Sequence, residues 1–440
     1  MENKNKFWKG VLVGVLASAF GCLLVVGLST GIYLWWNTAM SGNAGNLTVS
    51  GGKESGAEKK RDNRAMEAKL DVLQQVVDKY FLYDADPELM EQGIYKGFLA
   101  ALGDPYSQYY TEEEYKGMLE STEGVYCGIG VQVSQNLQTG IMTVTRVFKN
   151  SPGYEGGLLP GDMIAKVDGE DVAGQQLEDV VSQKIKGEEG TEVTLTVYRP
   201  SAEDYLDITM TRKIVEAGTV EYEMMDGNVG YVEVWQFDTV TAAQFEEAID
   251  DLESQGMEKL VIDLRDNPGG VLDGSVKMLA YLLPDGMLVS TKAKDGSGTA
   301  YRSDGGKLLY EVFADGKTVS SKEVEEDDHQ LDIPTAILVN GQSASASEVF
   351  TGAMKDYGRA TVVGTTTFGK GIVQNLIPLT DGTAVKLTVS NYYTPNGHNI
   401  HKKGIEPDVE VEMDSGVNVY QLEIPKEEDN QLQAAIEALQ

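Results

Sequence analysis

The feature that most constrains this sequence is an uncharged apolar run at residues 10–36, GVLVGVLASAFGCLLVVGLSTGIYLWW. It exceeds the roughly 20 residues that a helix needs to span a bilayer, and it is long for the core of a signal peptide. Lys4, Lys6 and Lys9 precede it, and by the positive-inside rule they place residues 1–9 in the cytoplasm. We therefore predict a retained single-pass transmembrane anchor. A cleaved signal peptide is the alternative.

The segment after this run predicts a tether followed by helices. Residues 37–62 are rich in Gly, Ser and Asn without an apolar period, which is typical of a flexible linker. The region 63–120 predicts two helices, of which the second follows Pro87 and ends at Gly103. These helices can pack within the chain or against a second copy, so a homodimer is one option. The first helix is indicated by apolar residues at helical spacing: Leu70, Leu73, Val76, Val77 and Tyr80.

Composition narrows the class of protein. A chain of 440 residues is too long for one compact core, so two or three domains are expected. The formal net charge of −33 argues against a nucleic-acid partner, because such binding needs Lys and Arg to neutralise phosphate. Cys22 and Cys127 lie in an apolar run and in a glycine-rich loop, so no disulfide framework is expected. Three histidines without a Cys-x-x-Cys pair predict no metal site, and the H-x-x-H spacing of His398 and His401 is interpreted as loop residues.

A glycine-interrupted turn runs into an alternating strand at residues 124–135, GVYCGIGVQVSQ. Successive amides in such a turn can hold a carboxylate, and the strand offers an edge to which an extended peptide can add. With the segments GGLLPGD and TLTVYR that follow, residues 121–212 resemble a PDZ domain. The resemblance implies that a peptide C-terminus binds at Tyr126, Gly128, Ile129 and Gly130. A PDZ-shaped domain that only braces its neighbours is the alternative.

Two strand-turn-helix units follow in the region 213–415. Residues 260–264 form a short apolar strand before the tight turn Asn-Pro-Gly-Gly at 267–270. Residues 335–339 form another strand, followed by a turn of small residues and a helix from about Ala346. Such units predict an α/β core with its functional loops at one end of the sheet.

Three serines lie in the second of these turns, NGQSASASEVF. The middle one, Ser345, is expected at a helix N-terminus, where unpaired amides and the helix dipole favour negative charge. This is a suitable place for a nucleophilic oxygen and for the oxyanion that its attack creates. Helix capping by Ser343, Ser345 or Ser347 is the plainer interpretation, and the local sequence alone favours it.

The base for such a nucleophile is the next question. Lys370 lies between two glycines in TTTFGKGIVQNL. It can accept a proton only when neutral, and lowering its pKa from about 10.4 to near 7 costs on the order of 4–5 kcal/mol. A dry pocket lined by Phe368, Ile372 and Val373 can impose that shift, and Gln374 can share a face with the lysine. An exposed loop lysine and a Ser–His pair using His398 are the alternatives.

Taken together these segments resemble the C-terminal processing peptidases, also called tail-specific proteases. The matching pattern is NGQSASASEVFTGAMKDYGRATVVGTTTFGKGIVQ at residues 340–374, with LRDNPGG before it and TPNGHNIHKKGIEPDVEV after it. The similarity extends from about residue 63 to the C-terminus. It implies an α/β spiral, crotonase-like core, and one departure is His398, where the family pattern leads us to expect Arg or Lys. The implied site consists of Ser345 as nucleophile, Lys370 as general base, Gln374 holding the lysine, and an oxyanion hole from the amides of Gly269 or Gly270 and of Ala346.

The resemblance implies an α/β multidomain, membrane-anchored bacterial serine endopeptidase with its catalytic domain outside the cytoplasm. It would cleave proteins or peptides with free C-termini under control of the PDZ domain, and it would need no cofactor because the chain supplies every catalytic group. A non-catalytic PDZ receptor or chaperone adaptor with a protease-like core is the alternative. The remaining residues, 416–440, predict a helical segment whose apolar side docks on the core or on another subunit: Leu432, Ala435, Ile436 and Leu439.

Overall fold

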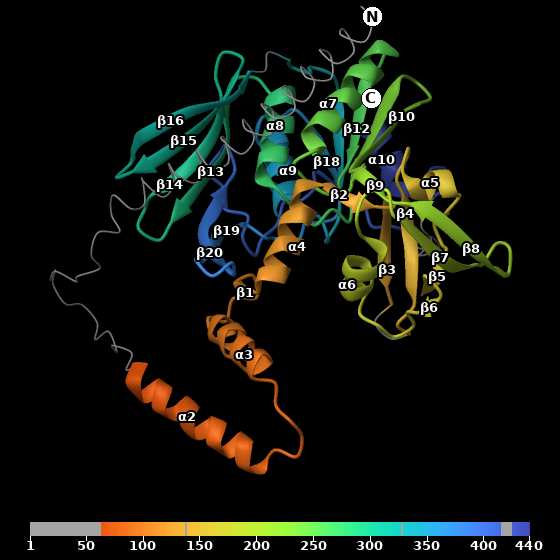
Figure 1. Cartoon of the computed structure of the whole chain (residues 1–440). Coiled ribbons are helices and arrows are strands. Elements are labelled where there is room, and N and C mark those ends of the chain that lie inside the picture. Colours follow the sequence, from red (N-terminus) through yellow and green to blue (C-terminus); the bar gives the residue numbers. More distant parts are fainter. Residues whose placement is uncertain (1–62, 137–138, 327–328, 415–424) are drawn as a thin grey trace, which may run out of the picture. The chain divides into compact units, whose positions relative to one another are not determined.

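The computed structural model describes residues 63–136, 139–326, 329–414 and 425–440 (Figure 1). The predicted cytoplasmic tail, anchor and tether at residues 1–62 lie outside these ranges. Within the described ranges, no helix combines the length and the apolar character needed to cross a membrane. The membrane anchor therefore stays a prediction.

The chain divides into two compact units, Met1–Ala85 and Asp86–Gln440. In the first unit, α2 (Asn63–Tyr80) confirms the predicted helix, and none of its residues is buried. The second unit begins with α3 (Pro87–Ala100), whose cap Asp86 accepts hydrogen bonds from the amides of Glu88 and Leu89. Proline at the first position of α3 needs no amide partner, as expected from the sequence.

A second capped helix leads into the middle of the chain. In α4 (Glu112–Glu123), the Thr111 hydroxyl accepts from the Glu114 amide at 3.3 Å, and the Glu114 carboxylate accepts from the Thr111 amide at 2.9 Å. Gly124 ends the helix with a φ of +69°, a conformation that glycine adopts without strain. The chain therefore passes at Gly124 from α4 directly into the predicted PDZ region.

The PDZ region is an antiparallel sheet in the order β3-β4-β5-β7-β8, with β6 paired to β5. Strand β3 lies at its edge, beside α6 (Leu177–Val180) and the π turn η1 (Val181–Ile185). Strand β2 (Val125–Gly128) enters the region and pairs with β9 (Lys213–Glu216), which leaves it. The other elements are β3 (Val131–Gln135), β4 (Met142–Val147), α5 (Pro152–Gly156), β5 (Met163–Val167), β6 (Glu170–Asp171), β7 (Glu192–Arg199) and β8 (Asp204–Thr211).

The core sheet follows in the order β10-β11-β12-β17-β18-β21. All neighbouring pairs are parallel except β10 with β11. Helices cover both faces, so the central strands contain uninterrupted apolar runs, at Leu260–Ile262 and Ala336–Val339, instead of alternating with polar residues. The strands are β10 (Val220–Met225), β11 (Val229–Val234), β12 (Lys259–Asp263), β17 (Thr335–Val339), β18 (Thr361–Gly364) and β21 (Val409–Glu410).

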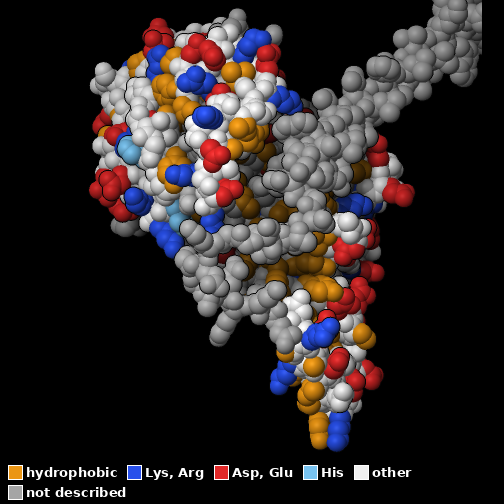
Figure 2. All heavy atoms as spheres, turned by 90° about the vertical axis from the view of Figure 1, so that its left-hand side faces the viewer, with side chains coloured by type: hydrophobic (Ala, Val, Ile, Leu, Met, Phe, Trp, Pro, Cys, Tyr) orange, Lys and Arg blue, Asp and Glu red, His pale blue; other side chains and the backbone are white. Residues whose placement is uncertain are grey.

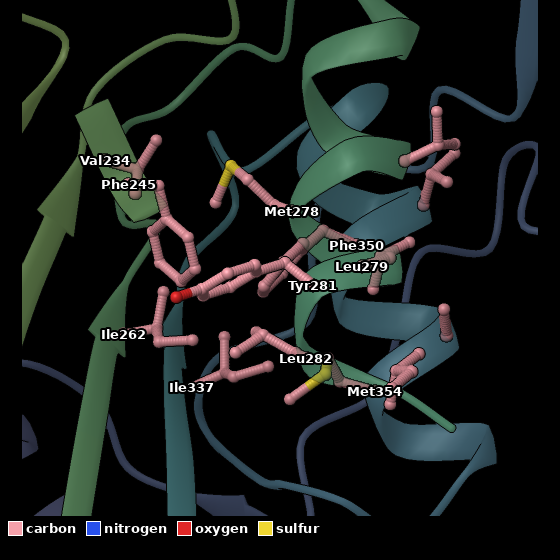
Figure 3. Close-up of a cluster of buried hydrophobic side chains, with 14 of the residues drawn as sticks. Val234, Phe245, Ile262, Met278, Leu279, Tyr281, Leu282, Ile337, Phe350 and Met354 are labelled. Atoms are coloured by element: carbon pink, nitrogen blue, oxygen red, sulfur yellow. The ribbon is translucent and has the colours of Figure 1, made fainter. Parts of the chain in front are cut away.

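The two faces of this sheet carry different helices. On one face, α7 (Thr241–Ser254), α8 (Leu272–Leu282) and α9 (Ala346–Asp356) bury a cluster that includes Ile262, Leu279 and Phe350 (Figures 1 and 3). On the other, α10 (Asn430–Ala438) buries Leu432, Ala435 and Leu439 against Val261, Leu338 and Val363. Of the two options left open by the sequence, the C-terminal helix therefore docks on the core of its own chain.

A second, seven-stranded antiparallel sheet was not anticipated from the sequence. Its order is β1-β20-β13-β14-β15-β16, and β19 also pairs with β20. Strand β19 begins two residues after Lys370, so this sheet fixes one side of the lysine loop. The strands are β1 (Gln108–Tyr110), β13 (Gly286–Ala293), β14 (Gly298–Ser303), β15 (Lys307–Ala314), β16 (Lys317–Glu326), β19 (Ile372–Pro378) and β20 (Ala384–Tyr393).

Surface charges are mixed on the face drawn in Figure 2, where Lys and Arg side chains are interspersed with Asp and Glu.

Candidate active site

Ser345 occupies the sharp turn between β17 and α9, one residue before the helix begins. Its φ of +56° and ψ of −112° are a combination that L-residues rarely adopt, and such strain is concentrated at functional sites. The residue is 8% exposed. The neighbouring hydroxyls have structural partners, because Ser343 Oγ donates to Leu264 O at 2.7 Å and Ser347 Oγ donates to Asn267 O at 3.0 Å. Of the three serines, the middle one is the candidate nucleophile.

The Asn-Pro-Gly-Gly turn packs directly against this serine. Gly269 has a φ of +94°, and a Cβ there would lie 2.5 Å from Ala344 O and 2.8 Å from Ala346 N. Only glycine fits, as expected for a backbone that must approach another backbone closely. Asn267 is fully buried and its side-chain oxygen accepts the Gly269 amide at 2.8 Å. Since that amide is already bonded, the amides of Gly270 and Ala346 are the remaining predicted oxyanion donors.

Ala346 is suited to this role by its position. It is the first residue of α9, where helix geometry provides no acceptor for the amide. The positive end of the helix dipole lies at the same place. An oxyanion formed at Ser345 would therefore meet a donor that is already oriented.

A buried carboxylate that the sequence analysis missed joins the two halves of the site. Glu348 has no exposed surface. One of its oxygens accepts the amides of Ser345 at 2.9 Å and Lys370 at 2.8 Å. The other accepts the Thr367 hydroxyl at 2.6 Å and the Gly369 amide at 2.7 Å. The serine turn and the lysine loop are thus held by one side chain, and the available signal was an acidic residue three positions after a serine at a helix start.

Lys370 is half-buried, and its environment favours the neutral amine. Desolvation is the main cause that lowers its pKa, and the positive charge of Lys386 lowers it further, while the Glu348 carboxylate opposes both. The Nζ atom lies 4.8 Å from the ring centroid of Tyr106. The direction of the predicted pKa shift is thus confirmed for this lysine.

The walls of the lysine pocket differ from the prediction. Ile372 is buried, but Phe368 is 52% exposed, so the expected contribution of this phenylalanine was wrong. Tyr106 and Lys386 come instead from distant segments, because β1 pairs with β20 and sets Gln108 opposite Lys386. The sequence around Lys370 does not indicate which side chains from distant segments will pack against the lysine.

The remaining predicted partner, Gln374, points elsewhere in this structure. Its Nε2 donates to Ile372 O and Thr388 Oγ1, both at 3.4 Å, where β19 shifts register against β20. Among the described residues, neither Ser345 Oγ nor Gln374 forms a hydrogen bond with the Lys370 amine. Ser345, Lys370 and Gln374 lie on adjoining elements, but Ser345 and Lys370 are not hydrogen-bonded to each other as a catalytic dyad requires.

The alternative base, His398, is poorly placed. Its side chain is 73% exposed, with Nδ1 3.7 Å from an oxygen of Asp356. Asp356 is the last residue of α9, and Ser345 precedes the first. A helix of 11 residues is about 16 Å long, so the geometry disfavours the Ser–His pair.

The four predicted peptide-binding residues, Tyr126, Gly128, Ile129 and Gly130, line one pocket of about 390 Å³. Its apolar wall is formed by the β3 edge together with α6 and η1. Lys186, another lining residue, has its Nζ 5.1 Å from the Tyr126 ring centroid and adds positive charge. Burial raises the pKa of Tyr126 to about 12, so the phenol stays neutral. The pocket thus combines an apolar wall, a glycine-rich turn and a nearby positive charge.

The same pocket also contacts the α/β core. Trp235, Gln236 and Asp238, just beyond β11, complete its lining. At this junction Arg146 of β4 bonds to Glu233 at 3.1 Å, and its guanidinium carbon lies 3.1 Å from the Trp235 ring centroid. A peptide in the pocket would therefore touch both domains.

The fold and these two sites define a class of proteins in which a PDZ domain is joined to an α/β core. Residues 228–411 match the family profile of peptidase family S41, and residues 143–199 match a PDZ domain. The chain therefore contains a peptidase family S41 domain and a PDZ domain.

Sequence similarity to curated proteins agrees with these domain matches. A "Probable CtpA-like serine protease" of Staphylococcus epidermidis (strain ATCC 35984) is 36% identical over 351 residues, 80% of this chain and 66% of the relative. The protein of the same name from Staphylococcus aureus (strain COL) is 37% identical over 344 residues, 78% of this chain and 64% of the relative. The matched region is thus slightly less than two thirds of each relative's length.

Solved structures provide a further comparison. The photosystem II D1 C-terminal processing protease is 27% identical, with a TM-score of 0.43 over 78% of this chain and 86% of that chain. A Bacteroides fragilis (NCTC 9343) protein assigned to the S41 proteases is 18% identical, with a TM-score of 0.50 over 87% of this chain and 98% of that chain. The second likeness is evidence for the fold alone.

Proposed function

We propose that this chain is a serine endopeptidase that cleaves protein substrates recognised through their C-terminal tails. The observation that carries the proposal is the Glu348 carboxylate, which binds the backbone amides of both Ser345 and Lys370. A fully buried carboxylate is costly unless every lone pair is used, and here its donors come from the two turns that would hold nucleophile and base. The names of the staphylococcal relatives support the same activity.

In the proposed reaction, the neutral Lys370 amine accepts the proton of the Ser345 hydroxyl while Oγ attacks the scissile carbonyl carbon. The resulting oxyanion accepts hydrogen bonds from the amides of Gly270 and Ala346. The lysine ammonium then gives its proton to the leaving amine, and the peptide bond breaks to give an acyl-enzyme. Water, deprotonated by the same lysine, releases the second product and restores the serine.

The PDZ pocket provides the specificity in this proposal. A substrate tail adds to the edge of β3 as a further strand, with its carboxylate at the Gly128–Gly130 turn near Lys186. Gln374 orients the amine once the site closes, because a neutral amide can accept from it without restoring its charge. Since Lys370 forms no hydrogen bond with Ser345 in the described structure, tail binding is proposed to align the dyad.

The open dyad also suits the second candidate function, a PDZ receptor that does not cleave. The two are separated by turnover of a peptide with a free C-terminus, compared with the same peptide amidated at its C-terminus. The endopeptidase should cleave the free form with a lower KM, and Ser345→Ala and Lys370→Ala should each abolish cleavage. The control His398→Ala changes an exposed side chain and should cleave normally. Equal cleavage by all three variants would refute the dyad.

Control by the PDZ domain is tested separately. A non-cleavable peptide with a free C-terminus, added in trans, should raise turnover of a second substrate that lacks a suitable tail. Unchanged turnover, or simple inhibition, would contradict gating.

Location in the bacterial cell membrane rests on residues 10–36, with the catalytic domain outside the cytoplasm. The homodimer is likewise a proposal, supported by the apolar side of α2, none of whose residues is buried. Fractionation of cells that express the full chain tests the first, and sedimentation of the purified chain tests the second.

A further inference from the structure

A second cluster of ligating side chains lies on the core, apart from Ser345 and Lys370. Asp250 and Glu253 belong to α7, and their spacing of three residues places both on one face of the helix. His329 belongs to the segment that follows β16. One ligand atom from each of the three lies within 4.8 Å of the others.

The imidazole of His329 is held in one orientation. Its Nδ1 lies 2.7 Å from the Tyr281 carbonyl oxygen, and a carbonyl can only accept, so Nδ1 carries a proton. The ring also stacks on the Tyr281 ring, with centroids 3.8 Å apart and planes 7° apart. Together these contacts direct Nε2 towards Glu253, whose Oε2 is 3.4 Å away.

The Asp250 carboxylate is oriented by the same tyrosine. The Tyr281 hydroxyl donates to an Asp250 oxygen. Histidines and carboxylates that bind metals have partners of this kind, which fix the ring and the carboxylate from the side away from the ion.

A positive charge between the facing atoms satisfies both of them, and either a proton on Nε2 or a metal ion can supply it. With a proton on Nδ1, a neutral imidazole presents a lone pair at Nε2, and the Glu253 oxygen is also an acceptor. A tetrahedral zinc ion, with bonds to N and O of about 2.0–2.2 Å, separates neighbouring ligand atoms by roughly 3.3–3.5 Å. The Nε2–Oε2 distance of 3.4 Å matches this separation, and the ligand atom of Asp250 lies within 4.8 Å of both.

We propose that Asp250, Glu253 and His329 form a binding site for a divalent transition-metal ion, zinc in the first instance. One imidazole and two carboxylates are a ligand set that zinc accepts, and water completes the tetrahedron. The site joins α7 to the segment that follows strand β16. A bound ion therefore links the end of strands β13–β16 to the core. It departs from the expectation of no metal, and it takes no part in the proposed peptidase chemistry.

The test uses the full chain, stripped of metal with a chelator and titrated with Co²⁺. The wild type should develop the visible absorption of tetrahedral Co²⁺ at one equivalent, and Zn²⁺ should displace it. Zn²⁺ should also raise the midpoint of thermal unfolding by a few degrees. His329→Ala should lose both responses, while Tyr281→Phe, which keeps the ring and the carbonyl, should weaken affinity by about 10- to 100-fold.

His398→Ala is the matched control, since it removes an exposed histidine beside a single carboxylate, and it should bind as the wild type does. If the wild type gives no Co²⁺ band and no Zn²⁺-dependent shift, the contact is an imidazolium–carboxylate ion pair and the proposal fails. Binding that persists in His329→Ala, or a response to Ca²⁺ but not to Zn²⁺, also overturns it.

Discussion

The Glu348→Gln substitution tests how strongly one carboxylate holds the two turns of the site. The best placement of the new amide leaves its oxygen on the Ser345 and Lys370 amides and turns its nitrogen towards Thr367 and Gly369. The Thr367 hydroxyl can rotate to accept, but the buried Gly369 amide then faces another donor. One orphaned buried donor costs about 1–3 kcal/mol, so the free energy of unfolding should fall by that amount.

The effect on catalysis should exceed the effect on stability. Displacement of the Gly369–Lys370 backbone moves the base relative to Ser345, and a misplacement of about 1 Å can lower kcat by about 100-fold. Urea unfolding and steady-state kinetics on a tailed peptide measure the two effects, with KM expected to change little because the PDZ pocket is untouched. Glu406→Gln, at an exposed position, is the control. An unchanged urea midpoint together with unchanged kcat in Glu348→Gln would refute the reasoning.

Three other predictions concern the base, the glycine turn and the C-terminal helix. Lys386→Met removes a positive charge that lowers the pKa of Lys370, so that pKa should rise and the acid limb of the kcat/KM profile should move to higher pH; an unmoved limb contradicts this. Gly269→Ala puts a methyl group 2.5 Å from Ala344 O at a φ of +94°, and it should lose activity and at least about 1–3 kcal/mol of stability; activity near the wild-type level would show that the turn can yield. Leu432→Ala empties a buried site between α10 and the sheet and should cost about 2–5 kcal/mol in urea unfolding, whereas a cost near zero would mean that α10 does not dock there.

Local patterns predicted those parts of the structure that local interactions determine. The proline at the start of α3, the strand-turn-helix unit around Ser345 and the glycine turn of the PDZ region were all predicted. In each case, a few neighbouring residues fix the backbone, and nothing remote is needed.

The parts that were missed depend on long-range pairing. Tyr106 reaches Lys370 because β1 pairs with β20, and no pattern near residue 370 encodes that register. The sheet of β13–β16 was missed for the same reason. Phe368 was expected to shield the lysine because it is apolar and adjacent, yet the turn directs it outward. Glu348 was not singled out, since its role appears only when the 367–370 loop lies against it.

The most direct measurement is covalent labelling of the full chain with a serine-reactive fluorophosphonate, followed by peptide mass spectrometry. The adduct should be on Ser345, and its rate of formation should rise with pH as Lys370 loses its proton. Ser345→Ala should give no adduct, and Lys370→Ala should label far more slowly. An adduct on another serine, or equal rates in Lys370→Ala and the wild type, would contradict the account.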